Sequence, residues 1–592
     1  MLSLYTEALE IYKALAEKHP DAYLTYNVAS VLNSLAILHD TLNQYDLAEK
    51  EYHEALDIRK TLSQKHPEVF LPDVARTLNG LAILHDTLNQ YDEAEKEYTE
   101  VLQIIKALAE KHPDAYRPDL AGTLNNMANL HAKVNKYYLA EKEYHEALEI
   151  FKALTKKHPD AYLPDVARTL NNMGNLHDIL NKYDLAEKEY NESLEIYRTL
   201  AEKHPDAYRP DLAAILNNLA NLHKTLNKYD LAEKEYHEAL EIRRSLAKKH
   251  PDAYRPDLAA ILNNLASLHK TLNKYDLAEK EYHEALEIRR SLAKKHPDAY
   301  LPNVAATLNN LAILHGTLNQ YDLAEKEYNE ALEIRRSLAE KHPDAYLPYV
   351  ARTLNNLANL HNIINKYGLA EKERNEALEI NKALAEKHLD AYLPDVARTL
   401  IGLAILHDTL NQYDLAEKEY NEALEIYRAL AEKPPDAYLP DVTGTLNNMA
   451  NLHETLNKYD LAENEYNEAL DIRRSLANKH PDVYLPDVAA TLNNLAILHE
   501  TLNQYDLAEK EYNEALEIRR IFYTKFPNAY CENICQTLYS FGDMLILYKI
   551  DEDRGRQLIK EAYKIATENN RQDLIDEINT KYGSFFLNRY KQ

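Results

Sequence analysis

Apolar residues recur at helical spacing in two successive stripes, which residues 298–343 show clearly. The first stripe consists of Val304, Leu308, Leu311, Ala312 and Leu314, and the second of Tyr321, Leu323, Ala324, Tyr328, Ala331, Leu332 and Ile334. Steps of three and four residues place each stripe on one face of an α-helix. The pattern therefore predicts two amphipathic helices, neither of which can bury its apolar face without a neighbour.

Proline, asparagine and histidine mark where these two helices should begin and end. Pro302 and Asn303 lie where the first helix should begin, because proline is favoured at the first helical position. Asn319 follows the last apolar residue, where asparagine can adopt the left-handed conformation of a helix end. His342–Pro343 ends the second helix, because proline cannot continue it. We expect helices of about 17 and 20 residues.

The same unit is repeated along almost the whole chain. Its His-Pro-Asp phrase has the proline, or a residue in its place, at positions 20, 67, 113, 159, 205, 251, 297, 343, 389, 435, 481 and 527. The first step is 47 residues and every later step is 46. Stacking such units buries both apolar faces, so a long array is stable where one unit is not. We expect a lone second helix of an incomplete first repeat at residues 1–20, eleven tandem helix pairs at 21–527, and a divergent repeat with a capping helix at 528–592.

The small and aromatic positions of the unit resemble the tetratricopeptide repeat. The positions that match the motif are Leu308, Leu311, Ala312, Tyr321, Ala324, Tyr328 and Ala331. His315 stands where the family usually has Tyr, and Asn319 where it usually has Gly. The 46-residue unit, with its phrase HPDxxxxxVAxTLNNLAxLH…YxLAExEYxxALEI, is more similar to the long repeats of kinesin light chain and related bacterial arrays. The resemblance implies an all-α fold, a right-handed α-solenoid of antiparallel helix pairs.

The amino-acid composition narrows the class of partner that the protein could bind and the cellular compartment in which we expect it. The chain has 592 residues, a net charge of −27 and a sequence pI of about 5.4, so a nucleic acid would be repelled on average. It has only two cysteines, Cys531 and Cys535, which fits a reducing compartment. The first residues lack the pattern of a signal peptide, and no apolar run is long enough to span a bilayer. We expect a cytoplasmic protein with no membrane partner.

Two series of histidines invite a metal interpretation, which their spacing does not favour. One series follows a leucine in every first helix: His39, His85, His131, His177, His223, His269, His315, His361, His407, His453 and His499. Its members lie on successive helices, roughly 10 Å or more apart, too far to share one zinc ion. The other series, His53, His145, His237 and His283, lacks the second histidine of a zinc-protease motif. We expect packed histidines in the first series, exposed ones in the second, and no metal.

Catalytic patterns are also missing from the sequence. Cys531 and Cys535 lie one helical turn apart without further cysteine or histidine partners in a recognisable cluster, which favours burial in the cap over metal binding. There is no glycine-rich phosphate loop and no Gly-x-Ser-x-Gly phrase. Residues repeated in every unit are typical of packing or of an extended surface. We therefore predict no enzymatic activity, no cofactor and no small-molecule substrate.

The resemblance implies that the first helices line a concave groove, and that a recurring asparagine lies in it. A side-chain amide both donates and accepts, so a row of amides can bind the backbone of an extended peptide. The alternative is that the asparagines bridge adjacent helices. The candidate groove residues are Asn125, Asn171, Asn217, Asn263, Asn309 and Asn355, with Asn129, Asn175 and Asn221 four residues further along the helix, and Lys224 and Lys270 at the next position.

Variation among the copies points to the middle of the array. The position of Lys224 and Lys270 carries Asp40, Asp86 and Asp178 in early units, and Asp408, Glu454 and Glu500 in late ones. We hypothesise that an extended acidic segment docks near Asn217, Asn263, Lys224 and Lys270, with neutral drift among copies as the alternative. The predicted function is a non-catalytic protein-interaction scaffold that binds a peptide or partner domain in its groove. The alternative is the sensor or regulatory arm of a larger nucleotide-binding signalling protein.

Overall fold

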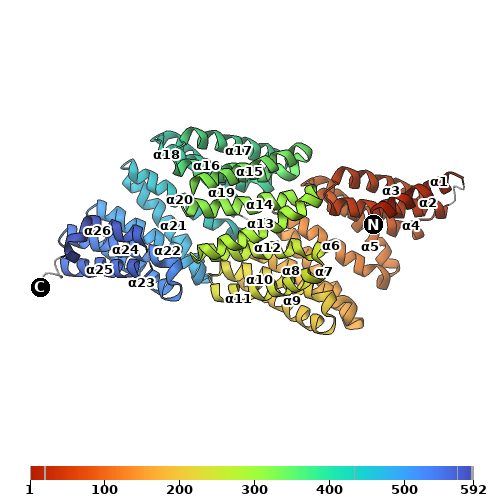
Figure 1. Ribbon diagram of the computed structural model, residues 1–592, viewed down its shortest axis with the longest axis horizontal. Coiled ribbons are helices and arrows are strands. Elements are labelled where there is room, and N and C mark those ends of the chain that lie inside the picture. The colour runs from red at the N-terminus through yellow and green to blue at the C-terminus, as the bar shows by residue number, and fades with distance from the viewer. Residues whose placement is uncertain (1, 19–21, 433, 570, 588–592) are drawn as a thin grey trace. The chain divides into compact units, whose positions relative to one another are not determined.

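The computed structural model describes residues 2–18, 22–432, 434–569 and 571–587, and in these residues it contains 26 helices and no strand (Figure 1). The helices are α1(Leu2–Lys18), α2(Ala22–Thr41), α3(Tyr45–Lys65), α4(Pro67–Thr87), α5(Tyr91–Lys111), α6(Pro113–Lys133), α7(Tyr137–Lys157), α8(Pro159–Ile179), α9(Tyr183–Lys203), α10(Pro205–Thr225), α11(Tyr229–Lys249), α12(Pro251–Thr271), α13(Tyr275–Lys295), α14(Pro297–Thr317), α15(Tyr321–Lys341), α16(Pro343–Ile363), α17(Tyr367–Lys387), α18(Leu389–Thr409), α19(Tyr413–Ala431), α20(Pro435–Thr455), α21(Tyr459–Lys479), α22(Pro481–Thr501), α23(Tyr505–Lys525), α24(Pro527–Leu547), α25(Glu552–Glu568) and α26(Gln572–Leu587).

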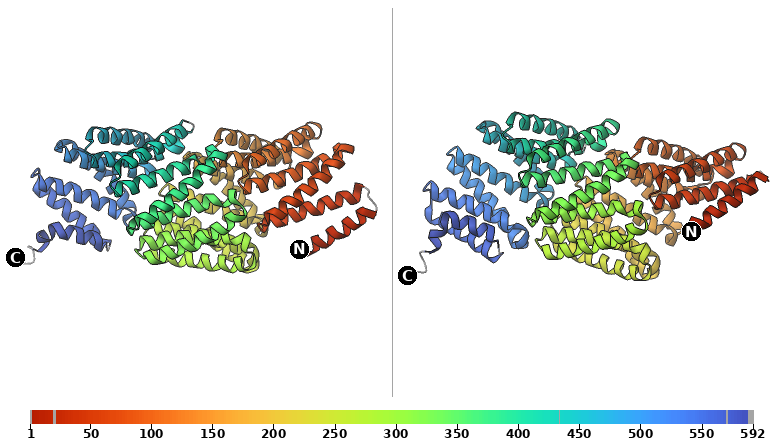
Figure 2. Two further views of the ribbon diagram at one scale, coloured as in Figure 1. Left: turned by 90° about the horizontal axis from the view of Figure 1, so that it is seen from above. Right: turned by 45° about the horizontal axis from the view of Figure 1, so that its top comes forward.

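The predicted all-α solenoid of antiparallel helix pairs is confirmed. Each even-numbered helix from α2 to α22 is the first helix of a pair, and the following odd-numbered helix is the second. The pairs lie side by side, which Figure 2 shows for α1 to α4. Alanines without exposed surface allow this close approach, and tyrosines are the largest buried side chains between them. The apolar stripes of the sequence therefore form the core.

The first helix begins five residues earlier than the sequence predicts. Helix α14 begins at Pro297, not at Pro302, and it is 21 residues long, as is α15. His296 separates α13 from α14, so the proline of the His-Pro-Asp phrase takes the first helical position. At the other end Asn319 has φ of 58°, and Gln320 N–H donates to His315 O, as predicted for a left-handed helix end.

The chain divides into two compact units. Unit 1 consists of residues 1–222, 230–266 and 279–399, and unit 2 of residues 223–229, 267–278 and 400–592. In unit 2 the last pair, α24 and α25, is packed against α26 through Ile578 and Tyr582. Cys531 and Cys535 are buried there with free thiols, as predicted, and burial raises the pKa of Cys535 to about 12.

In two repeats of unit 1, the proline inside the first helix frees a carbonyl group that a loop distant in sequence binds. Pro302 lies inside α14 and has no N–H, so the carbonyl of Asp298 has no partner within its own helix. In unit 1 that carbonyl accepts a hydrogen bond of 2.9 Å from Nδ2 of Asn43, 255 residues earlier. The same bond joins Asn89 to Asp344 at 2.8 Å. Repeats that are distant in sequence are therefore fastened together within this unit.

Replacing Asn89 with glycine is expected to loosen this fastening without straining the loop. Asn89 has φ of 59°, which glycine adopts freely, so the substitution removes mainly the side chain and its bond to Asp344. We expect a loss of about 1 kcal/mol and faster amide hydrogen exchange at the start of α16. Asn365→Gly is the control, because Asn365 has the same φ sign and the same tyrosine contact but makes no such distant bond within the described residues. Equal exchange in both variants would contradict the prediction.

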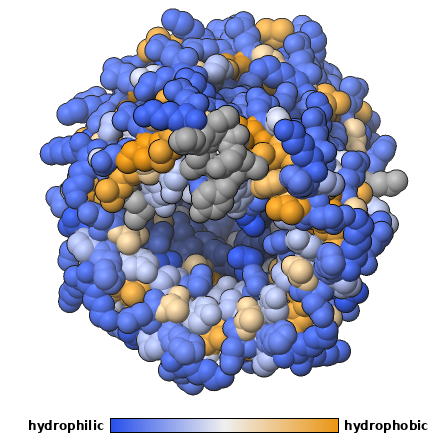
Figure 3. All heavy atoms as spheres, turned by 90° about the vertical axis from the view of Figure 1, so that its right-hand side faces the viewer, coloured by the Kyte–Doolittle hydropathy of each residue, from blue (hydrophilic) through white to orange (hydrophobic). Residues whose placement is uncertain are grey.

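No helix in the described part of the chain combines the length and the apolar character needed to cross a bilayer. Seen from the right-hand side of Figure 1, the surface is predominantly hydrophilic, with scattered apolar groups and a hollow at the middle of the view (Figure 3).

Candidate functional site

The candidate asparagines belong to a ladder that runs from one first helix to the next. In six repeats of unit 1, the second asparagine of the Asn-Asn doublet donates from Nδ2 to Oδ1 of the corresponding first asparagine in the preceding repeat. The bonds are Asn126 to Asn79 at 3.3 Å, Asn172 to Asn125 at 3.4 Å, Asn218 to Asn171 at 2.9 Å, Asn264 to Asn217 at 2.9 Å, Asn310 to Asn263 at 3.2 Å, and Asn356 to Asn309 at 3.2 Å. The bridging that the sequence left open is thus present, and it places the doublets in one row.

Not all members of this row are equally accessible. Asn125 and Asn309 are buried, whereas Asn171, Asn217 and Asn263 are half-buried. Asn355 is also half-buried and donates to Thr399 Oγ1 at 2.9 Å. A side-chain amide has two donor hydrogens and two acceptor lone pairs, so one ladder bond leaves capacity for a further partner. Asn171, Asn217 and Asn263 are therefore three successive ladder asparagines that keep exposed surface.

The candidate asparagines four residues further along bind the second helix of their own repeat. Asn129, Asn175 and Asn221 accept hydrogen bonds from the hydroxyl groups of Tyr144, Tyr190 and Tyr236, respectively. Where Arg374 replaces this tyrosine, its guanidinium donates to Asn359 at 2.6 Å and is itself buried. These asparagines thus position a buried side chain and are half-buried or exposed at the surface.

The two candidate lysines occupy equivalent positions on α10 and α12. Lys224 is half-buried and its ammonium group donates to Ser267 Oγ at 2.6 Å. Burial, with the charge of Lys270 as a second cause, lowers the pKa of Lys224 to about 8. Burial also lowers the pKa of Lys270. Each ammonium is therefore charged at neutral pH in surroundings that favour the arrival of an anionic group.

Carboxylates occupy the same position in other repeats. Burial raises the pKa of both Asp40 and Asp178 to about 6. Burial also raises the pKa of Asp86, but Lys133 donates to this carboxylate at 2.8 Å and opposes the shift. In unit 2, Glu454 and Glu500 accept hydrogen bonds from Tyr466 and Tyr512, and burial raises the pKa of each glutamate. At this position the sequence has acidic residues in early repeats, lysines in the middle and acidic residues in late repeats. These charged groups are therefore partly buried.

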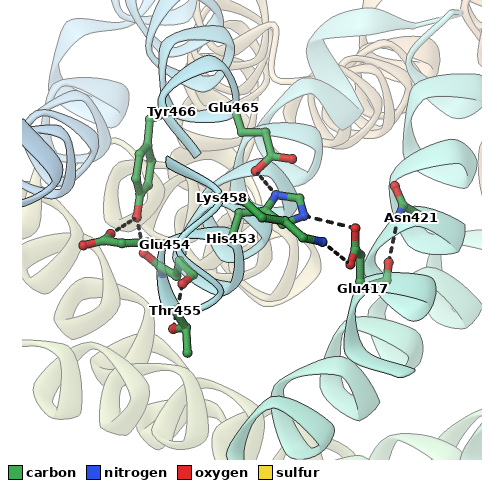
Figure 4. Close-up of polar contacts among 9 residues, drawn as sticks. Glu417, Asn421, His453, Glu454, Thr455, Lys458, Glu465 and Tyr466 are labelled. Atoms are coloured by element: carbon green, nitrogen blue, oxygen red, sulfur yellow. Dashed lines mark hydrogen bonds and ion pairs between the residues drawn. The ribbon is translucent and has the colours of Figure 1, made fainter. Parts of the chain in front are cut away.

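The histidines of the first helices are buried, and several of them lie between two glutamates. Figure 4 shows His453 with Glu465 on one side at 2.8 Å and Glu417 on the other at 3.3 Å, while Lys458 holds Glu417 at 2.8 Å. The hydrogen bond from Lys458 lowers the pKa of Glu417. Burial of this series agrees with the packing role that the sequence predicts, and the ion pairs give it polar partners.

Sequence reasoning missed a row of buried arginines on the second helices. Arg335 on α15 has 3% of its surface exposed, and it donates to Thr353 Oγ1 and to the carbonyl of Tyr349 on α16. Arg289 and Arg519 make the corresponding bonds to the helix that follows their own. The signal in the sequence is the pairing of this arginine with a threonine 18 residues later, which no single helix shows.

A cavity of about 340 Å³ opens in unit 1 where two repeats depart from this pattern. Ile105 and Phe151 replace the buried arginine there, and Gly122 leaves space that a side chain would otherwise occupy. Asn79 and Asn126 of the ladder, together with Arg76 and Arg168, line the same cavity. The cavity was not predicted from the sequence, and it adds a recess beside the row of amides whose charged lining consists of Arg76, Arg168, Asp119 and Asp165.

Known proteins resemble this chain in sequence and in structure. Models described as "Tetratricopeptide repeat" match residues 28–68, 74–114, 119–199, 211–291, 257–337, 349–429 and 441–521. A comparison with curated proteins finds no match. Among solved structures, BtubC (BKLC) from P. vanneervenii is 27% identical over 42% of this chain and 92% of that one, with a TM-score of 0.34. Yeast Tom70 is 17% identical over 93% of this chain and 95% of that one, with a TM-score of 0.42. A Rap protein complexed with competence and sporulation factor is 17% identical over 66% of this chain and 97% of that one, with a TM-score of 0.41.

Proposed function

Since the chain belongs to the tetratricopeptide repeat family, we propose that it is a non-catalytic protein-interaction scaffold that holds an extended acidic segment of a partner protein along its first helices. The observation that carries the proposal is the asparagine ladder. It fixes amides in register from repeat to repeat, and the backbone of an extended peptide offers donors and acceptors at regular intervals. A cytoplasmic location stays a prediction.

The middle of the array supplies the preference for acidic side chains. Helices α10 and α12 each carry a half-buried ladder asparagine, Asn217 or Asn263, and a lysine seven residues later. Seven residues are about two helical turns, so amide and ammonium share one face of each helix. A bound carboxylate beside Lys224 would relieve the repulsion from Lys270. Amides thus hold the peptide backbone and the lysines select its charge.

We expect a fluorescent peptide of alternating glutamate and serine to bind the full chain, and Lys224→Ala/Lys270→Ala to weaken this binding at least tenfold. Loss of two charge-assisted contacts of about 1 kcal/mol each gives this factor. Lys248→Ala/Lys294→Ala is the matched control, because it removes the same charge from exposed sites on α11 and α13. Fluorescence anisotropy measures both. Equal affinity of the two double variants would contradict the proposal.

The same binding is expected to depend on pH with a defined sign. Lys224 has a pKa near 8, so it is protonated at pH 6 to 7 and loses its charge as the pH rises through 8. Affinity for the acidic peptide should therefore be constant from pH 6 to 7 and fall between pH 7 and 9. The Lys224→Ala variant should show a flatter profile over the same range. An unchanged slope in that variant would assign the pH dependence to another group.

A further inference from the structure

The two histidine series meet in unit 1 at the contact between α13 and α14. His283 belongs to the exposed series on the second helices, and His315 to the buried series on the first helices. Members of one series are too far apart to share an ion, but these two have ring centroids 6.4 Å apart. Glu279 lies one helical turn before His283 on α13, on the same face. From this geometry we propose that Glu279, His283 and His315 bind a divalent transition-metal ion of the zinc type.

The distances are close to those that zinc requires. Oε1 of Glu279 lies 3.6 Å from Nε2 of His315 and 3.9 Å from Nε2 of His283. One ligand atom of each residue lies within 4.8 Å of the other two. Zinc bonds of about 2.0–2.2 Å in tetrahedral geometry place neighbouring ligand atoms about 3.3 Å apart. The side chain of His283 is 52% exposed and can rotate, so closing the site needs no movement of the backbone.

His315 is held in the orientation of a metal ligand. Its side chain has no exposed surface, and Nδ1 donates to Oε2 of Glu327 at 2.7 Å. Nε2 makes no hydrogen bond within the described residues and faces Glu279 and His283. A carboxylate on one ring nitrogen fixes the imidazole and leaves the other nitrogen to the ion, as in many zinc sites. Glu327 thus positions His315.

In other repeats a lysine binds the glutamate that would otherwise be free to hold an ion. Lys136, Lys182, Lys366 and Lys458 each donate to the glutamate that corresponds to Glu279, at 2.6, 3.2, 2.7 and 2.8 Å. Figure 4 shows one of these, Lys458 on Glu417, in a repeat where Asn421 stands in place of His283. At the corresponding position α14 is followed by Gln320, which carries no charge. No lysine thus competes with an ion for Glu279 at this position.

The donor set selects the class of ion. Two imidazole nitrogens and one carboxylate oxygen suit Zn²⁺ and its neighbours Co²⁺, Ni²⁺ and Cu²⁺, whereas Mg²⁺ and Ca²⁺ prefer oxygen alone. Three protein ligands leave a fourth position for water or for a side chain of a partner. An ion at this site would join the second helix of one repeat to the first helix of the next.

A related arrangement near the start of the chain must be removed before the site is tested. Glu49 lies 3.8 Å from His53 and 3.7 Å from His85, and Gln90 takes the place of Gln320. The parent protein for the experiment is therefore the full chain without a histidine tag and with His53→Asn. Asparagine is the residue that most other repeats carry at this position, so the fold is retained.

The test is a Zn²⁺ titration in competition with a chromophoric chelator, supported by the visible spectrum of bound Co²⁺. We expect His283→Asn in this parent to remove one Zn²⁺ equivalent or to weaken its binding at least tenfold. Gln320→Lys should do the same while keeping all three ligands, because the new ammonium competes for Glu279. Both changes introduce residues that other repeats already carry.

His145→Asn is the matched control and is expected to leave the titration unchanged, since Lys182 already holds Glu141 in that repeat. Equal stoichiometry and affinity for the parent and for His283→Asn would overturn the proposal. Loss in His283→Asn but none in Gln320→Lys would overturn the assignment of Glu279 as a ligand. Circular dichroism of each variant, expected to be the same as that of the parent, verifies that the helices are intact.

Discussion

Arg335→Ala is expected to lower the local free energy of unfolding of α15 and α16 by about 3 kcal/mol. Arg335 is buried, and it donates to the Thr353 hydroxyl and the Tyr349 carbonyl on the next helix. Truncation removes these charge-assisted bonds and leaves a cavity between two repeats. Because most contacts of a repeat are with its neighbours along the array, and the distant bond of α16 joins its first turn to Asn89, the effect should be largest in α15 and α16.

Arg335→Tyr provides the control, because tyrosine occupies this position at residues 197 and 427. Tyr197 fills the space and places its hydroxyl 3.4 Å from the carbonyl of Pro164. Burial also lowers the pKa of Arg335 to about 10, so the cation is held at some cost that tyrosine avoids. We expect a loss of about 1 kcal/mol or less for this variant.

Native-state hydrogen exchange distinguishes these outcomes by location. Central amides of α15 and α16 should exchange faster in Arg335→Ala, while amides of α24 stay at the wild-type rate. Arg335→Tyr should change both regions little. If both substitutions lower the free energy of unfolding by the same amount, filling the space between the repeats would not be what stabilises them. Our interpretation of the buried arginines would then be wrong.

The helix pairs could be predicted from sequence because their signal is local and repeated. Apolar spacing, the left-handed Asn319 and the break at Pro343 each involve a few adjacent residues, and all three are confirmed. The start of α14 was predicted wrongly, since Pro297 and Pro302 both resemble the first residue of a helix. The same early start is found in α4, α6 and α8, each of which continues through its second proline, and the pattern of one repeat does not show that the helix tolerates a proline in its second turn.

Only part of the candidate site could be predicted from the sequence. The first asparagine of each doublet drew attention, but its partner in the ladder, such as Asn218 or Asn264, did not, although the doublet is visible in the sequence. His283 and His315 were each assigned to a separate series, and their meeting depends on the packing of one pair on the next. Whether the groove residues bind a peptide remains a prediction.

Asp178→Asn is expected to stabilise the protein at pH 7 and to have no effect at pH 4. Burial raises the pKa of Asp178 from its ordinary value near 4 to about 6. A carboxyl group with a raised pKa contributes stability that is present below its unfolded pKa and is lost as the pH rises through its folded pKa. Two pKa units correspond to about 3 kcal/mol, and partial exposure reduces this to about 2 kcal/mol.

The gain should therefore appear between pH 4 and pH 6 and be complete by pH 7, measured as hydrogen exchange of α8 and α9. Asp86→Asn is the control at the equivalent position of an earlier repeat. Burial raises the pKa of Asp86 as well, but Lys133 donates to it at 2.8 Å and opposes this shift, so the substitution should stabilise the protein at pH 7 less than Asp178→Asn does. An equal gain at pH 7 in both variants, or a gain in Asp178→Asn that persists at pH 4, would contradict the assignment of the effect to a buried carboxylate without a cationic partner.

Asp178 lies at the same position of its repeat as Lys224 does in the next, on the face that we propose for peptide binding. A carboxylate that destabilises the free protein is retained at a cost, and a cationic side chain of a partner would recover that cost on binding. Asp178→Asn should then raise stability while weakening any partner that places lysine or arginine there. If a cationic peptide binds the wild type and the variant with equal affinity, Asp178 affects only the stability of the free protein and takes no part in binding.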